Sequence, residues 1–423
     1  MKRAWIGILL ILALVATISC VGGCGKPAAD SGTQEEVGKI VIGETEPLTG
    51  PIAVYGVPEC NATKLAVDEI NAAGGLEVNG KKYKIELVQL DDQLNPTLAF
   101  QNVKKLVEVH GAQFLIGFTN AAMIMPAMSY IQQKKIPVVV GGAPDEIITA
   151  TPNPYVFRMR PPTAYTALAT GKFIYNEFGV RTMAVIGTVS EQALFKDIAE
   201  GTMKGFEAMG GKVTSVQDFK SSQQDMSAQI TAALATQPDA IYALAPIESQ
   251  AFVYKQLREL GYKGKIFGFS GGNVKQFTKI CTVDQLEGIF DLIPAEINPT
   301  DTSINGPGAD AFVENYRKAF GEDPPPVAGY TYDAMKTLAA AIQAAGTLDP
   351  DAVVRELENL AVPEGLVLQW VPVEGKLFDS SHQAYIPNAA FVFQGGKKVV
   401  YKLMDSPIAE YSKKLAEARA SNK

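Results

Sequence analysis

One short string in this chain has the residue types and spacing of a catalytic nucleophile. Gly268-Phe269-Ser270-Gly271-Gly272 fits the G-x-S-x-G pattern, in which a serine sits on the tight turn between a strand and a helix. The reaction would be acyl transfer, with His382 as the base and Asp333 or Asp351 as the acid that orients it. No HGGG-type oxyanion sequence accompanies the string. The alternative is a ligand-facing turn, in which glycines let the backbone approach a solute and Ser270 offers a hydrogen bond.

Other residue types argue against metal, nucleotide and nucleic-acid chemistry. The two histidines, His110 and His382, have no Cys, Asp or Glu at metal-ligand spacing, so no metal site is expected. Because the sequence has no P-loop and no well-placed G-x-G-x-x-G, it predicts no cofactor. Nucleic acid requires clustered Lys and Arg, whereas this chain has a formal net charge of −7 and no such cluster. Cys60 and Cys281 lack the spacing of a disulfide framework and are expected to stay unpaired.

The elements that must position a ligand begin with the stretch Lys39–Gly75. Its first apolar run, Ile40–Ile42, is typical of a strand buried on both faces of a parallel sheet. Glycines and prolines then predict a loop, and from about Cys60 the apolar spacing becomes helical. Ligands of open α/β sheets bind beyond the carboxyl ends of the strands, so Tyr55 in this loop is a candidate ligand wall. The alternative is an ordinary loop with a surface tyrosine.

Short apolar strands alternate with amphipathic helices along most of the chain. This alternation predicts an α/β fold with doubly wound parallel sheets and right-handed crossovers. Extended stretches at Tyr155–Pro162 and Leu286–Pro294 interrupt it, which suggests two lobes with a cleft between them. We expect β-rich hairpins over 366–401. The run from Tyr411 is either an amphipathic helix or a fraying tail.

The first residues predict export and a lipid anchor. Lys2 and Arg3 precede the uncharged apolar run Ala4–Ile18, which has the length of a signal peptide core. Val21-Gly22-Gly23-Cys24 resembles the bacterial lipobox, so Cys24 is the expected lipidated residue; an ordinary secretory leader is the alternative. Residues 25–38 lack periodicity and indicate a flexible tether. We therefore expect the protein in the periplasm or on the outer face of the cell membrane.

Taken together, these features resemble the type I periplasmic binding proteins, specifically the leucine/isoleucine/valine-binding family of ABC-transporter receptors. The residues that carry the resemblance are Pro47-Leu48-Thr49-Gly50-Pro51, Ala53-Val54-Tyr55-Gly56, the run from Ala66 to Gly75, Asp91-Asp92, Gly117 before Pro126, Ile136-Pro137 and Tyr332-Asp333-Ala334. The resemblance covers Ile40 to about Tyr401. It implies two lobes that close over one small solute and deliver it to a membrane permease.

This resemblance also implies where the chain divides. The implied parts are a lipoprotein signal peptide 1–23, a tether 24–38, a first lobe 39–157 plus 290–363, a second lobe 158–289 plus 364–404, and a C-terminal tail 405–423. Three crossings would fall near Phe157, near Ile289 and near Pro363–Trp370. Such a receptor is expected to be a monomer without catalytic activity. A sensory receptor that docks to a signalling partner is the alternative, and a Ser270 esterase is a more remote one.

Ligand-binding positions follow from the same resemblance, aligned by loop length. Tyr55 matches the aromatic residue of the first loop. Thr119, Asn120 and Ala121 match a loop in which family members bind the amino acid carboxylate with backbone N–H groups and a hydroxyl. The second carboxylate loop corresponds to Gly142, Ala143 and Pro144. In the second lobe the candidates are Ser190, Leu194, Ile247, Glu248 and Ser270.

At three of these positions the sequence departs from the family pattern. Ala121 and Pro144 stand where hydroxyls are expected, and Ser270 stands where amino acid binders place an acid for the ammonium. An unmatched ammonium costs several kcal/mol once closure excludes water. We therefore expect a solute other than a zwitterionic branched-chain amino acid, such as a small carboxylate, an aromatic acid or an amide.

Overall fold

The computed structural model describes residues 37–50, 52–191 and 193–422, and from Val37 onward the chain forms one compact unit. The expected signal peptide, Cys24 and the tether up to Glu36 lie outside the described residues. Within the described ranges, no helix combines the length and the apolar character that a membrane crossing needs.

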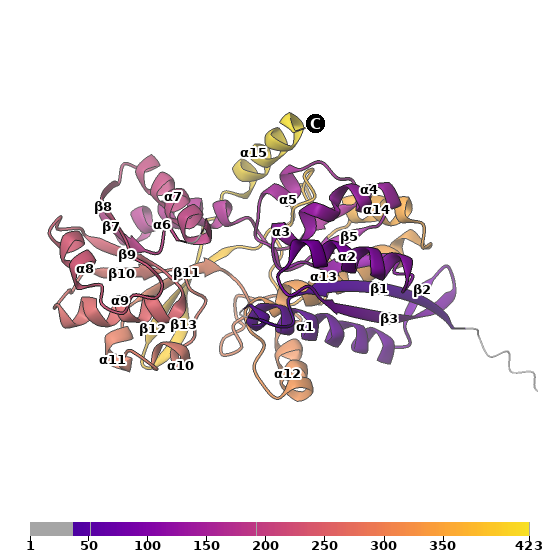
Figure 1. The fold of residues 1–423 in the computed structure, drawn as a ribbon, viewed down its shortest axis with the longest axis horizontal. Helices are drawn as coiled ribbons and strands as arrows, with labels where there is room; N and C mark the ends of the chain where they lie inside the picture. Colours follow the sequence, from indigo (N-terminus) through magenta and orange to yellow (C-terminus); the bar gives the residue numbers. More distant parts are fainter. Residues whose placement is uncertain (1–36, 51, 192, 423) are drawn as a thin grey trace, which may run out of the picture. The chain divides into compact units, whose positions relative to one another are not determined.

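The first lobe is built on a six-stranded sheet, sheet A, in the order β2-β3-β1-β4-β5-β6. All neighbouring strands are parallel except β2 and β3. The strands are β1 (Gly38–Glu46), β2 (Leu76–Val78), β3 (Lys81–Asp91), β4 (Phe114–Gly117), β5 (Val138–Val140) and β6 (Val156–Arg158). Ile40 and Ile42 of the central strand β1 are fully buried, because helices cover sheet A on both faces (Figure 1).

Helices from two separate parts of the chain cover sheet A. They are α1 (Ala53–Ala72), α2 (Pro96–Glu108), α3 (Ala121–Ile124), η1 (Met125–Ala127), α4 (Met128–Lys134), α5 (Ile147–Ala150), α12 (Ala309–Phe320), α13 (Ala328–Ala345) and α14 (Pro350–Asn359). One apolar cluster joins them and runs in sequence from Ile40 to Ile386. The core of the first lobe is therefore discontinuous in sequence.

The second lobe is built on sheet B, with seven strands in the order β13-β12-β11-β10-β9-β7-β8. Its strands are β7 (Thr182–Gly187), β8 (Lys212–Asp218), β9 (Ala240–Leu244), β10 (Lys265–Gly268), β11 (Phe290–Pro294), β12 (Asn388–Gln394) and β13 (Lys397–Met404). Its helices are α6 (Thr163–Phe178), α7 (Ala193–Ala208), α8 (Ser227–Leu234), α9 (Ile247–Glu259), α10 (Val274–Phe277) and α11 (Val283–Leu286). Only β12 and β13 are antiparallel to their neighbours, so the predicted α/β fold with two doubly wound parallel sheets is confirmed.

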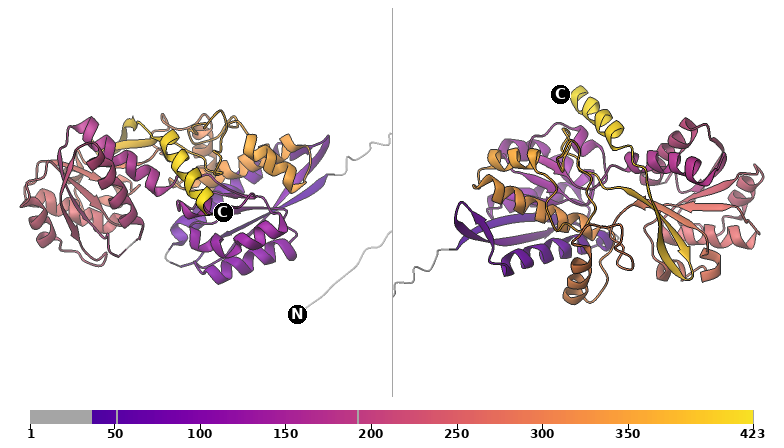
Figure 2. Two further views of the ribbon diagram at one scale, coloured as in Figure 1. Left: turned by 90° about the horizontal axis from the view of Figure 1, so that it is seen from above. Right: turned by 180° about the vertical axis from the view of Figure 1, so that it is seen from behind.

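Three segments connect the two lobes (Figure 2). Residues 159–162 lead from β6 to α6, residues 295–308 lead from β11 to α12, and Pro387 precedes β12. The crossings expected near Ile289 and near Pro363–Trp370 were placed too early in the sequence. β11, which follows Ile289, still pairs in sheet B, and residues 366–386 still pack in the core of sheet A. Residues 366–386 form no regular strand, so they carry no periodic pattern that would assign them to either lobe.

The loop after β1 is shorter than its glycines and prolines predicted. β1 continues through Gly43, and α1 begins at Ala53 rather than near Cys60. A Cβ on Gly56 would lie only 2.3 Å from the carbonyl oxygen of Pro47. Glycine here permits close packing within regular elements, which in sequence looks the same as a turn.

Only one of the hairpins expected over 366–401 is present. β12 and β13 are joined at Gly395-Gly396, whose φ angles are +56° and +74°. Residues 366–387 are irregular and are held by two buried carboxylates, Asp333 and Asp379. Asp379 accepts hydrogen bonds from the N–H groups of Ser381 (2.8 Å) and Gln383 (3.1 Å) and from the hydroxyls of Tyr385 (2.8 Å) and Ser412 (2.7 Å).

The C-terminal run is the helix α15 (Ile408–Ser421), one of its two expected forms. Tyr411 and Leu415 of this helix join a small apolar cluster with Ala150, Tyr165 and Tyr385. These partners come from α5, from α6 and from the segment before the third crossing. The last helix therefore docks where the lobes are connected (Figure 2).

Candidate ligand-binding site

The expected ligand-binding residues lie at the carboxyl edges of the two sheets. Each follows a parallel strand by a few residues or lies in the first turn of the next helix, where ligands of α/β proteins bind. Tyr55 is in the first turn of α1 rather than in a loop, and its side chain is 46% exposed. The structure thus places an aromatic face at the edge of sheet A, available to a solute.

In the first lobe, Thr119 links several segments at the carboxyl edge of sheet A. Its hydroxyl donates to Glu46 and to Glu59, the latter at 3.1 Å. The carboxylate of Glu59 lies against Gly142, where a Cβ would come within 2.6 Å of Oε1. The loops after β1, β4 and β5 are therefore brought together by two buried glutamates that the sequence analysis did not single out.

Three carboxyl groups, of Glu44, Glu46 and Glu59, are fully buried beneath these loops. Glu44 and Glu46 are two residues apart on β1 and so point to the same face of sheet A. Burial is the largest cause that raises the pKa of Glu44 and of Glu59 to about 7. Burial and repulsion from Glu59 together hold the pKa of Glu46 well above its ordinary range. At neutral pH the cluster therefore retains protons that exposed glutamates would have lost.

Glu59→Gln should make the protein more stable at pH 8 by about 1 to 2 kcal/mol and change it little at pH 5. The folded-state pKa of about 7 exceeds the ordinary 4.5, so this group stabilises the fold at low pH and loses that contribution as the pH rises from 4.5 through 7. A neutral amide does not titrate. Urea unfolding at both pH values measures the effect, with the exposed Glu77→Gln as control. An equal change at both pH values would contradict a buried titrating group.

Two further residues of the first lobe were missed by the sequence analysis. Asp145 accepts a hydrogen bond from the backbone N–H of Ala121 at 2.8 Å. Arg160, on the first crossing, donates to the Gly142 carbonyl oxygen (2.9 Å) and contacts Glu296 (3.3 Å). Burial lowers the pKa of the Arg160 guanidinium, but the nearby carboxyl groups, Glu296 above all, outweigh burial and raise it. The guanidinium therefore stays charged beside the loop of Gly142.

In the second lobe, Ser270 is fixed by a buried ion pair. Asp291, fully buried on β11, accepts from the Ser270 N–H (2.9 Å) and hydroxyl (3.2 Å) and from the Gly271 N–H (3.1 Å). Lys398 balances this carboxylate at 2.5 Å and also donates to the carbonyl oxygen of Gly272 (3.1 Å). An acid is thus present next to the position of Ser270, but its charge is already paired.

Other second-lobe candidates differ in how closely they join this edge. The side chain of Ile247 would contact a Cβ on Gly272 at 3.3 Å, so it belongs to the same loop region as Ser270. Ser190 is bound by its N–H to Asp218 (3.0 Å), at the end of β8. Leu194 is 42% exposed on α7, and Glu248 is exposed in the first turn of α9. In the structure, Ser190, Leu194 and Glu248 have no contact with the Ser270 loop among the described interactions.

In the part of the chain that the structure describes, no catalytic triad is assembled around Ser270. His382 lies in the first lobe, stacked on Phe157 at 4.1 Å, with its Nδ1 near the Val156 carbonyl oxygen (3.1 Å) and its Nε2 near Glu358 (3.3 Å). Of the two proposed acids, Asp333 binds backbone N–H groups and Asp351 pairs with Lys135. The esterase hypothesis is therefore wrong in its arrangement of residues. Among the described residues, no cluster of His, Cys, Asp and Glu is arranged to hold a metal.

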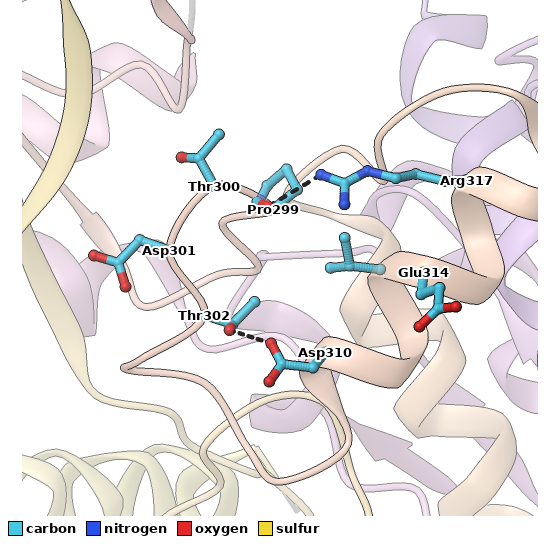
Figure 3. A pocket seen from close by; sticks show the side chains of 8 residues that line it. Pro299, Thr300, Asp301, Thr302, Asp310, Glu314 and Arg317 are labelled. Atoms are coloured by element: carbon cyan, nitrogen blue, oxygen red, sulfur yellow. Dashed lines mark hydrogen bonds between the residues drawn. The ribbon is translucent and has the colours of Figure 1, made fainter.

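A surface pocket of about 460 Å³ lies elsewhere, between the loop 299–302 and α12 (Figure 3). It is lined by Pro299, Thr300, Asp301, Thr302, Asp310, Val313, Glu314 and Arg317. Two of its polar groups are already bound within the pocket, since Thr302 donates to Asp310 (2.5 Å) and Arg317 donates to the Pro299 carbonyl oxygen (3.2 Å). None of the expected ligand-binding residues lines it.

Comparison with known proteins decides the family. The family model described as periplasmic binding protein matches residues 39–397. The chain belongs to this family. A relative of this periplasmic binding protein is the leucine-, isoleucine-, valine-, threonine-, and alanine-binding protein of Pseudomonas aeruginosa, 26% identical over 321 residues. The match covers 75% of this chain and 82% of the relative.

Solved structures show the same fold. The branched-chain amino acid transporter substrate-binding protein of Streptococcus pneumoniae, in complex with isoleucine, has a TM-score of 0.69 and 21% identity, over 87% of this chain and 100% of that one. A solute-binding protein from R. palustris, in complex with benzoate, has a TM-score of 0.68 and 20% identity, over 87% and 98%. The family expected from the sequence is confirmed.

Proposed function

We propose that this periplasmic binding protein is the extracytoplasmic receptor of an ABC transporter of the branched-chain amino acid type. It would bind one small solute between its lobes as a monomer and deliver the solute to a membrane permease. Its relatives support this, since they include binding proteins for branched-chain amino acids. The observation that carries the proposal is that the expected ligand-binding residues of both lobes lie at the carboxyl edges of parallel strands.

The solute proposed from the sequence is a small carboxylate, an aromatic acid or an amide rather than leucine itself. The paired charges of Asp291 and Lys398 support this, because the edge near Ser270 then offers no free acid to an ammonium. Ser270 and Asn120 would act as neutral hydrogen-bond partners. Calorimetry on refolded, ligand-free protein tests this with leucine, isoleucine and valine beside organic acids and amides. Micromolar leucine binding would overturn it and implicate Glu248 or Glu191 as the missing charge.

Tyr55→Ala should weaken solute binding by about 1 kcal/mol or more and leave the melting temperature of the ligand-free protein nearly unchanged. The side chain is half exposed at the edge of sheet A, so it contributes contact area to a ligand and little to the core. Calorimetry and thermal melts measure the two effects separately. Equal losses of binding and of stability would show that Tyr55 has a structural role instead.

Cys24 is the proposed lipidation site, from the Val-Gly-Gly-Cys match to the lipobox. A diacylated cysteine anchors firmly, whereas a single chain holds only weakly. Mass spectrometry of detergent-phase protein should find the modified N-terminus at Cys24. A mature chain that starts at Cys20, or beyond Cys24, would refute the assignment.

Deletion of the gene for this protein in its host distinguishes a transport role from a sensing role. Loss of uptake of the bound solute supports delivery to a permease. Unchanged uptake with a lost cellular response to that solute would favour the sensory receptor.

A further inference from the structure

Two hydrogen-bond donors at the edge of sheet A, one on each side of Asn120 in the sequence, are already bound by the protein's own carboxylates. The Thr119 hydroxyl donates to Glu46 and Glu59, and the Ala121 N–H donates to Asp145 at 2.8 Å. A solute carboxylate needs such donors. To bind to the Thr119 hydroxyl or to the Ala121 N–H, it would have to displace a carboxylate that belongs to the protein's own side chains.

One hydrogen-bond acceptor at this edge, on Asn120, has no donor within the described part of the chain. The Oδ1 atom of Asn120, next to Ala121, is buried and has no partner among the described residues. Oε1 of Glu46 and Oε1 of Glu59 also lack a partner there, but the pKa values of both groups are raised, so these carboxyl groups retain protons at neutral pH and are not counted as free acceptors. Glu59 Oε1 faces the Gly142 loop, where a Cβ would come within 2.6 Å of it. A buried acceptor without a donor is costly, so the edge favours a ligand that donates.

Charged groups of both signs surround Asp145 at this edge. Arg160 is the cation beside the Gly142 loop, and its guanidinium already contacts Glu296 (3.3 Å) and the Gly142 carbonyl oxygen (2.9 Å). Asp145 is only partly buried and uses Oδ2 for the Ala121 N–H, and its Oδ1 accepts nothing from the described residues. On α7 of the second lobe, the pKa of Asp197 is raised by burial and next by Glu200, and Asp145 makes a smaller contribution. Arg158, which is fully buried, is a second guanidinium near Asp145: burial lowers its pKa, and nearby tyrosines and acids, Asp145 among them, act in the opposite direction.

We infer that Asp145 determines the specificity of the site: it occupies the Ala121 N–H and makes the edge of sheet A select an amide or ammonium group of the solute instead of a carboxylate. The inference rests on the proposed receptor function; of the solute classes proposed there it keeps the amide and excludes the carboxylates, and it adds an amine, whose charge Asp145 would meet in place of the paired Asp291. An N–H group of the solute would donate to Oδ1 of Asp145 and to Oδ1 of Asn120. Asp145 thus keeps a solute carboxylate from the Ala121 N–H and itself binds an amide or ammonium group of the solute.

Solutes that share one apolar part and differ in the polar end test this directly. Isovalerate, isovaleramide and isoamylamine form one such set, and benzoate, benzamide and benzylamine form another. Calorimetry on the full mature chain should show the amide or the amine of a set binding at least tenfold tighter than its carboxylate. A carboxylate that binds as tightly as both partners overturns the inference and leaves the proposed function standing. Failure of all six to bind to folded protein overturns both.

Two variants separate the blocking from the binding. Asp145→Asn keeps an acceptor for the Ala121 N–H but removes the charge, so it should weaken amine binding about tenfold without admitting the carboxylate. Asp145→Ala frees the N–H, so it should also strengthen carboxylate binding and reduce the amide-to-acid ratio at least tenfold. Asp405→Asn, at an exposed acid, controls for net charge. A ratio unchanged in Asp145→Ala, with the melting temperature retained, would show that Asp145 does not set specificity.

Discussion

Replacing Asp333 by alanine is expected to lower the free energy of unfolding by about 4 kcal/mol. This carboxylate, on α13, is fully buried and accepts from the N–H groups of Val367 (2.8 Å) and Leu368 (2.9 Å) and from the indole Nε1 of Trp370 (2.7 Å). Alanine would leave three buried donors without partners, at about 1 to 3 kcal/mol each before relaxation. Denaturant unfolding with an unchanged m-value measures the loss.

The matched controls for this change are Asp333→Asn and Glu364→Ala. Asparagine retains one acceptor oxygen, so its loss of stability should be smaller than that of alanine. Glu364 is exposed two residues before the irregular segment, and its removal should change stability by less than about 0.5 kcal/mol. A loss below 1 kcal/mol in Asp333→Ala would mean that water replaces the carboxylate and that Asp333 does not hold this segment.

The second large effect is expected in the other lobe, where Lys398→Met should cost about 3 kcal/mol. Asp291 is fully buried and Lys398 only 12% exposed, so the substitution leaves a buried carboxylate without its cation. Methionine keeps the apolar stem but loses the ammonium, which also lies 5.0 Å from the ring centre of Phe391. Because Asp291 holds the backbone N–H groups of Ser270 and Gly271, hydrogen exchange there should become faster.

Lys397→Met is the control for Lys398, since the neighbouring lysine is exposed at the start of β13. It removes the same charge and should leave both stability and exchange unchanged. If Lys398→Met lost less than 1 kcal/mol and exchange at Ser270 stayed slow, Asp291 would not depend on the ion pair.

The order of strands and helices was predictable because each is short, apolar or amphipathic, and bounded by polar residues. β9 (Ala240–Leu244) is a short apolar run, and α2 starts at Pro96, a residue type that is favoured at the first position of a helix. The start of α1 was not predictable, because glycine and proline mark turns and close helix packing alike. The irregular segment 366–387 is fixed by hydrogen bonds to Asp333 and Asp379, which leave no periodic trace in the sequence.

The candidate site was predictable by position and not by chemistry. Loop order alone places Thr119 and Ser270 at strand ends, because parallel strands end at one edge of a sheet. The chemistry around Thr119 and Ser270 depends on Asp145, Asp291 and Arg160. These three residues come from other parts of the sequence and approach the site only in the folded protein. One signal was available: Glu44-Thr45-Glu46 sets two acids on one face of an otherwise apolar strand, and such a pair in a buried strand indicates a polar network.

The discontinuous core of the first lobe also governs the order in which the molecule can fold. Its apolar cluster contains residues from Ile40 to Ile386. Sheet A, which β1 to β6 form, is therefore not fully covered until α13 and the irregular segment have been added. The parallel part of the second lobe, from α6 to β11, is continuous and can form sooner. Contacts of such long sequence separation form slowly. In a chain with the proposed leader, the first lobe would thus stay unfolded until the end of the chain has emerged, and an unfolded chain is the state that a membrane translocase can thread.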